Sequence, residues 1–107
     1  MTIPLEKLTD PAVRTLLIAI NAGDERMFRA ALTEDATMSD DGTDRDLYAW
    51  ADREIFSSHG RIAVQTEKDA GRYLIATFTN DAWGEMRTAW RFHVEQGRIS
   101  RFETGQA

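Results

Sequence analysis

Two adjacent carboxylates and a glycine, Asp40, Asp41 and Gly42, form the part of this sequence best suited to chemistry. A carboxylate that points into an apolar pocket is desolvated and placed to act as a general base. Asp40 also has a plainer interpretation, because an Asp before Asp-Gly bonds its own backbone in a tight turn. Asp41 is expected to be the solvated member of that turn. A one-residue shift of the preceding strand would reverse the direction of Asp40, so the sequence leaves that direction open.

No other residue pattern suggests a reactive centre. The sequence contains no Cys, which excludes a thiolate nucleophile, a disulfide and a Cys-based zinc site. His59 and His93 fall on separate predicted elements, with His59 expected to cap a helix end and His93 to lie on the outer face of a sheet. No P-loop, G-x-G-x-x-G or G-x-S-x-G pattern occurs. We therefore predict no metal and no cofactor.

Length and charge narrow the class of protein further. The 107 residues predict a single domain, residues 1–107, and no apolar run approaches the roughly 20 residues of a membrane span. The net charge of −5 arises mainly in the first 60 residues, so we expect no nucleic-acid partner. The basic residues are nearly all Arg, which hints at a bacterial source. The start shows no export signal, and a cytoplasmic location is expected.

Helices are predicted before residue 60 and strands after it. Asp10 and Pro11 begin a first helix that Gly23 ends. The run "DERMFRAAL" predicts a short second helix, "EDATMSDDG" a brief strand ending at Asp40, and "TDRDLYAWADREIFSSHG" a third helix capped by Thr43 or Asp44. An apolar period of two then predicts a four-stranded antiparallel meander formed by "RIAVQTEKD", "RYLIATFTND", "GEMRTAWRFHVE" and "GRISRFET".

The face patterns of the meander indicate how the sheet is covered. In its third strand Thr88, Trp90 and Phe92 share one face, which is expected to meet the helices. The second strand is apolar on both faces, which indicates that its outer face is covered as well. A second copy of the chain is the expected cover. We therefore predict an α+β fold, with three N-terminal helices packed on one face of a curved, mainly antiparallel sheet, in a homodimer formed through the outer sheet face.

The order helix, helix, strand, helix, meander and the stretch "AINAGDERMFRAALTEDATMSDDG" resemble the nuclear-transport-factor-two-like superfamily. Within it, the chain is similar to SnoaL-like cyclases and ketosteroid isomerases over nearly its whole length. The resemblance implies a cone-shaped roll of the cystatin-like type, with an apolar pocket between helices and concave sheet. The superfamily includes isomerases, cyclases, dehydratases, epoxide hydrolases and non-catalytic domains, so the fold leaves the activity open.

The resemblance also assigns candidate site residues. Asp40 falls where ketosteroid isomerases keep their carboxylate base, whereas Leu16 and Trp90 fall at the tyrosine and protonated aspartic acid of their oxyanion hole. Leu16 has no polar group and Trp90 offers one indole N–H, so steroid isomerisation is disfavoured. The residues expected to line the ligand pocket are Leu16, Tyr48, Thr88 and Trp90.

Three functions remain open from the sequence. The favoured one is binding of a small apolar ligand, since the resemblance implies a cavity and the oxyanion donors are missing. The second is a cofactor-independent isomerase, cyclase or dehydratase, in which Asp40 moves a proton and Trp90 or Thr88 donates a hydrogen bond. The third is a dimerisation or accessory module whose cone is filled by aromatic side chains. Trp83, in a hairpin turn, is predicted to form a pocket lip or a subunit contact.

Overall fold

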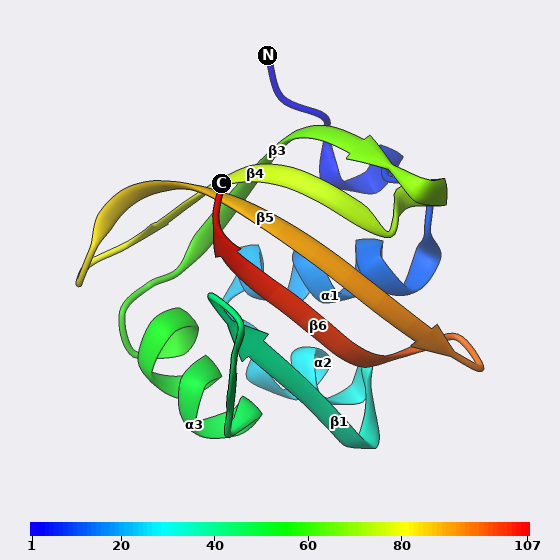
Figure 1. The fold of residues 1–107 in the computed structure, drawn as a ribbon, viewed down its shortest axis with the longest axis horizontal. Helices are drawn as coiled ribbons and strands as arrows, with labels where there is room; N and C mark the ends of the chain where they lie inside the picture. The colour runs from blue at the N-terminus through cyan, green and yellow to red at the C-terminus, as the bar shows by residue number, and fades with distance from the viewer.

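The computed structural model describes residues 1–107 as a curved six-stranded sheet with helices on one face (Figure 1). The elements are α1 (Pro11–Ala22), α2 (Glu25–Ala30), β1 (Leu32–Asp40), β2 (Thr43–Arg45), α3 (Leu47–Ala51), the π-helical turn η2 (Asp52–Phe56), β3 (Arg61–Lys68), β4 (Tyr73–Asn80), β5 (Gly84–Glu95) and β6 (Arg98–Gln106). Short 3₁₀ turns occupy Leu5–Lys7 and Asp69–Gly71. No helix in the structure has the length and apolar character needed to cross a membrane.

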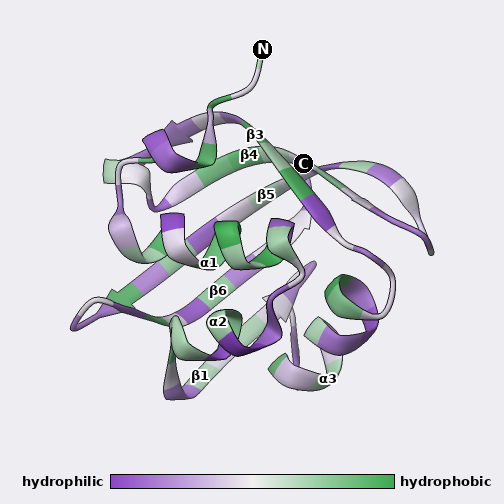
Figure 2. Cartoon of the chain, turned by 180° about the vertical axis from the view of Figure 1, so that it is seen from behind, coloured by the Kyte–Doolittle hydropathy of each residue, from purple (hydrophilic) through white to green (hydrophobic).

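The strands follow the order β2-β1-β6-β5-β4-β3. β1 and β6 run parallel, and all other neighbours are antiparallel. The predicted α+β class with a mainly antiparallel sheet is therefore confirmed. α1 and α2 lie behind the sheet in Figure 1 and in front of it in Figure 2, so both cover the same face.

The hydrophobic core lies between α1 and the concave face of the sheet. On α1, Leu16, Leu17 and Ile20 are fully buried, as helical spacing on one face requires. On β5, Trp90 and Phe92 are buried while Arg91 and His93 are exposed, which confirms the predicted inner face. Burial of each such side chain stabilises the fold by about 1.5–3 kcal/mol relative to exposure.

Local signals place the first helices as predicted. The Asp10 carboxylate accepts hydrogen bonds from the backbone N–H groups of Ala12 and Val13, and Gly23 ends α1 in the left-handed conformation with φ 63°. The Asp24 carboxylate accepts from the N–H of Met27 at 2.9 Å and begins α2. These polar atoms satisfy backbone groups that a helix end leaves free.

The start of the third helix differs from the prediction. Its cap is Asp46, whose carboxylate accepts from the N–H of Ala49 at 3.0 Å. The predicted cap residues Thr43 and Asp44 instead form β2, which pairs with the end of β1 across a turn at Asp41 and Gly42. The cap prediction was wrong because three Asp or Thr residues precede the helix, and pairing with β1 takes up the first two.

β1 is also longer than predicted. It begins at Leu32, directly after the second helix, and runs to Asp40. Its parallel partner β6 comes from the far end of the sequence, with an irregular register between Leu32 and Thr37. The alternation of polar and apolar residues is weak in this first half, so only the long-range pairing reveals it as strand.

Candidate functional site

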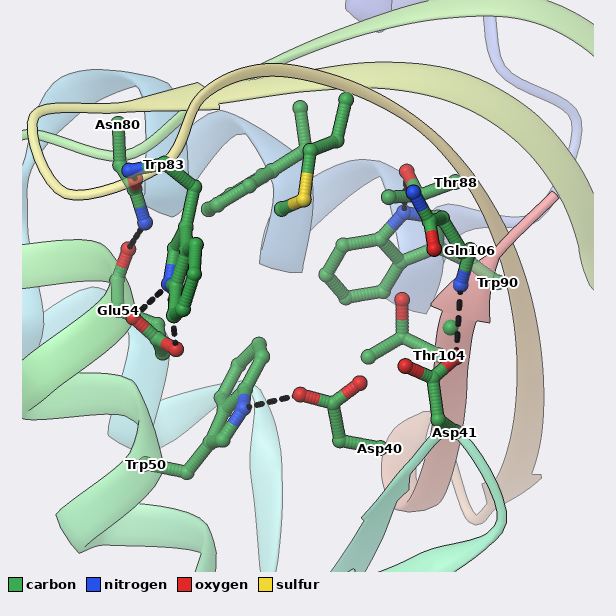
Figure 3. A pocket seen from close by; sticks show the side chains of 13 residues that line it. Asp40, Asp41, Trp50, Glu54, Asn80, Trp83, Thr88, Trp90, Thr104 and Gln106 are labelled. Atoms are coloured by element: carbon green, nitrogen blue, oxygen red, sulfur yellow. Dashed lines mark hydrogen bonds between the residues drawn. The ribbon is translucent and has the colours of Figure 1, made fainter.

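A cavity of about 320 Å³ opens beside α3, at the ends of four strands of the sheet (Figure 3). Its lining consists of Asp40, Asp41, Trp50, Glu54, Phe78, Asn80, Trp83, Met86, Thr88, Trp90, Thr104, Gly105 and Gln106. Its hydrophobic lining residues are three Trp together with Phe78 and Met86, and three carboxylates supply its charge. No Lys, Arg or His is among the lining residues.

Asp40 is the last residue of β1, and its carboxylate reaches into this cavity (Figure 3). Its Oδ2 accepts a hydrogen bond from Nε1 of Trp50 at 3.0 Å, whereas Oδ1 has no hydrogen-bond partner within the chain. The direction of the side chain is fixed by register, because Asp40 is paired with Thr104 of β6 on one side and Thr43 of β2 on the other.

Asp41 has a structural role in the adjacent turn. It adopts a positive φ of 50°, and its Oδ1 accepts from the backbone N–H of Gln106 at 2.9 Å. A Cβ on Gly105 would lie 2.5 Å from that oxygen, so glycine is needed for the turn to approach β6. Asp41 thereby fastens the rim of the cavity to the end of β6, while its side chain remains exposed.

The hairpin that carries Asp40 is also held from outside the cavity. The Arg101 guanidinium on β6 donates to Oδ1 of Asp44 at 2.8 Å and to the hydroxyl of Thr37 at 2.9 Å. The hydrogen bond to Asp44, together with the charges of Asp44 and Glu103, raises the pKa of Arg101 above its usual value. The guanidinium thus joins β2 and β1 to β6.

The helical wall of the cavity comes from α3 and η2. Trp50 and Glu54 lie four residues apart and so share one face. The π turn between Asp52 and Ser57, closed by an N–H to carbonyl bond of 2.8 Å, leaves the carbonyl oxygen of Glu54 to accept from the side-chain amide of Asn80 at 3.0 Å. Non-α turns of this kind are frequent at functional sites.

The β4–β5 hairpin forms the lip of the cavity. Trp83 at its tip keeps 64% of its surface exposed, and its Nε1 donates to both carboxylate oxygens of Glu54, at 3.2 and 3.3 Å (Figure 3). The hairpin also contacts the segment that follows η2, since Nδ1 of His59 lies 2.6 Å from Oδ2 of Asp81. His59 was expected to cap the helix end, and its ring instead contacts the hairpin.

The floor of the cavity has few free hydrogen-bond donors. The Trp90 indole donates to Oγ1 of Thr88 at 2.8 Å, and that hydroxyl donates to the carbonyl of Ala76 at 3.1 Å. Thr104 donates to the carbonyl of Ala89 at 3.1 Å. Among the lining side chains, the amides of Gln106 and Asn80 keep N–H donors without a partner in the chain, two in Gln106 and one in Asn80.

The structure brings together three of the five residues singled out from the sequence. Asp40, Thr88 and Trp90 lie on the cavity wall. Leu16 lies outside it, fully buried between α1 and the sheet, and Tyr48 lies on the side of α3 that meets α2, with the Arg29 guanidinium 4.2 Å from its ring centroid. The helix rotation that aims Trp50 at the cavity turns Tyr48 away from it.

Sequence reasoning missed several lining residues. Glu54 had a usable signal, because it is one helical turn after Trp50. Asn80 and Gln106 had none, since they enter through the ends of strands β4 and β6, whose positions depend on long-range pairing. His93 lies exposed on the outer sheet face as predicted, with Nε2 3.3 Å from a carboxylate oxygen of Glu103.

Comparison with known proteins identifies the fold. No protein-family model matches the chain, and no curated protein matches its sequence. An NTF2-like protein of unknown function from Cytophaga hutchinsonii matches with a TM-score of 0.75 and 15% identity, over 100% of this chain and 93% of that chain. A candidate polyketide cyclase from Sinorhizobium meliloti matches with a TM-score of 0.77 and 16% identity, over 95% and 99%.

A third solved structure holds a ligand. Protein RV0760c from Mycobacterium tuberculosis, in complex with estradiol-17β-hemisuccinate, matches with a TM-score of 0.71 and 15% identity, over 87% of this chain and 88% of that chain. Together these likenesses show that this chain has the nuclear-transport-factor-two-like (NTF2-like) fold, which confirms the resemblance seen in the sequence. At such low identity the likeness shows the fold and carries no activity with it.

Proposed function

We propose that this chain binds a small molecule with an apolar body in the cavity beside α3. The observation that carries the proposal is a cavity of about 320 Å³ lined by Trp50, Trp83 and Trp90 together with the free oxygen of Asp40. Ligand sites are typically concave, mainly apolar and supplied with a few directed polar groups, with volumes of roughly 300–1,000 Å³. A ligand of the size of a substituted six-membered ring fits such a volume.

The neighbouring folds support binding as the general role. The Mycobacterium tuberculosis protein holds a steroid ester, and a computationally designed binder of 17-OHP shares the fold with a TM-score of 0.72 and 15% identity. The third hypothesis, a filled accessory module, is less favoured because side chains leave this cavity open.

A second candidate function is acid–base catalysis by Asp40. It is supported by one observation: Oδ1 of Asp40 faces the cavity while Trp50 holds Oδ2, as a positioned general base requires. The donors that would stabilise an enolate are missing, since Trp90 and Thr88 donate within the protein. Ligand binding is therefore the function that the geometry supports better.

Pairing through the outer sheet face remains a proposal of its own. Tyr73, Ile75 and Thr77 on the outer face of β4 are half-buried in the single chain, and a second copy would cover them. Light scattering of the purified chain should give a dimer mass, and Ile75→Lys should give a monomer. A monomer in the wild-type chain would contradict this proposal.

The binding proposal is tested with a neutral apolar probe, cyclohexylmethanol, followed by ¹H–¹⁵N NMR. Saturable shifts of the indole N–H signals of Trp50, Trp83 and Trp90 are expected. Met86→Trp should abolish them, because the larger side chain occupies the cavity, while Val94→Trp at the other end of the same strand face serves as a control. If neutral and charged probes alike leave the three indole signals unmoved in the wild-type chain, the proposal is wrong.

A further inference from the structure

The charge of the cavity is more specific than its apolar surface. Asp40, Asp41 and Glu54 line it, and no basic side chain does. The free oxygen of Asp40 is directed inward, and the Glu54 carboxylate lies at the lip beside Trp83 (Figure 3). Carboxylates gathered at a partly enclosed, low-dielectric wall attract cations and repel anions more strongly than they do in open water.

The hydrogen-bond capacity of the wall points the same way. The donors of Trp50, Trp83 and Trp90 are all used within the protein. One acceptor is unused, because Oδ1 of Asp40 has no hydrogen-bond partner in the chain. A ligand that brings N–H donors is therefore satisfied here, whereas a ligand carboxylate would meet a wall poor in free donors and would be left partly unpaired.

The indole rings add a third contribution. Trp83 and Trp90 stand on opposite sides of the cavity, with Trp50 and Asp40 between them (Figure 3). The faces of aromatic rings attract cations, indole most strongly. The indoles of Trp50 and Trp83 each donate their N–H to a carboxylate, and such hydrogen bonding polarises the ring further toward negative charge.

We propose that the ligand of this cavity is an organic cation, a protonated amine carried on a small apolar body. In this arrangement the ammonium group pairs with Oδ1 of Asp40, and Glu54 is the second carboxylate of the cavity. The apolar body rests on Trp90. The inference rests on the proposed function, since it names the chemical class of ligand for the same cavity.

The test uses three probes that share one ring and differ only in charge: cyclohexylmethylamine, cyclohexylmethanol and cyclohexanecarboxylate. Each is titrated at pH 7 and low salt, and the dissociation constant is read from the indole N–H signals of Trp50 and Trp83. The affinity for the amine is expected to exceed that for the alcohol by about tenfold, because a cation–π contact and an ion pair with a carboxylate both favour the cation. The carboxylate is expected to bind more weakly than either.

Two variants remove one charge each and keep the internal bonds. Asp40→Asn and Glu54→Gln retain a carbonyl oxygen that accepts from Trp50 and Trp83, respectively. Each should reduce the ratio of amine affinity to alcohol affinity severalfold, because one of the two carboxylates that attract the cation is lost. Glu85→Gln is the matched control, because Glu85 is exposed on β5 next to the lining residue Met86 and is itself outside the lining.

The outcomes separate this inference from the proposed function. Equal binding of amine and alcohol, tighter binding of the acid, or a charge preference unaffected by Asp40→Asn and Glu54→Gln would overturn the cationic ligand while leaving apolar binding intact. Absence of indole shifts with all three probes would overturn both. A preference for the amine that falls equally in Glu85→Gln would show a general charge effect and would also contradict the assignment to this cavity.

Discussion

Replacement of Asp40 by alanine tests whether the bond to Trp50 holds the cavity wall together. Trp50 is only 5% exposed, and Oδ2 of Asp40 accepts its Nε1 proton at 3.0 Å. Removing the carboxylate leaves a largely buried N–H without a partner, which costs about 1–3 kcal/mol. We expect Asp40→Ala to lower the free energy of unfolding by about 2 kcal/mol, or the melting temperature by roughly 8 °C.

The assay is urea denaturation followed by circular dichroism, arranged as a double-mutant cycle. The cycle compares Asp40→Ala, Trp50→Phe and the double variant, and the coupling energy is expected to be about 1–2 kcal/mol. Asp40→Asn is the matched control, because its amide oxygen still accepts from Trp50 and most of the stability should return. A residue kept for chemistry at the expense of stability behaves oppositely, since its removal stabilises the fold. Unchanged or raised stability in Asp40→Ala, or no coupling with Trp50, would therefore refute this account.

Three further substitutions test other parts of the structure by the same denaturation assay. Asp10→Ala removes the cap of α1 and the partner of Arg72, 3.0 Å away, and should cost about 1–2 kcal/mol. Thr88→Val keeps the shape of the side chain but leaves the buried N–H of Trp90 unpaired, and should cost about 1–3 kcal/mol. Gly60→Ala places a Cβ 2.9 Å from backbone atoms at the end of η2, and should cost about 1–3 kcal/mol through forced backbone shifts.

Each of these predictions has a contrary result. Equal stability of Asp10→Ala and Asp10→Asn would show that capping by this side chain is unimportant. Thr88→Val as stable as Thr88→Ser would place the Trp90 N–H in contact with water. An unaffected Gly60→Ala would show that the chain after η2 has room to move, in contrast to the close packing described.

Local chemistry determined much of this fold. Helix α1 begins at Asp10 and Pro11 and ends at Gly23, as predicted, because helix capping and the left-handed conformation depend on residues close in sequence. The change to period two after Gly60 predicted the four strands of the meander, and the alternation around Trp90 predicted its inner face. The same local rules failed at Thr43 and Asp44, where pairing with β1 competes with helix capping.

The tertiary structure decided the site. The direction of the Asp40 side chain depends on the register of β1 between β2, which follows it directly in sequence, and β6, at the other end of the chain. A shift of one residue would have turned the side chain away from the cavity. Whether an aromatic residue fills the core or lines a cavity depends equally on how distant elements pack: Trp50 reaches the cavity, whereas Tyr48, two residues earlier, does not. The sequence supplies the carboxylates and indoles, and only the packing of α3 against the strand ends places them around one cavity.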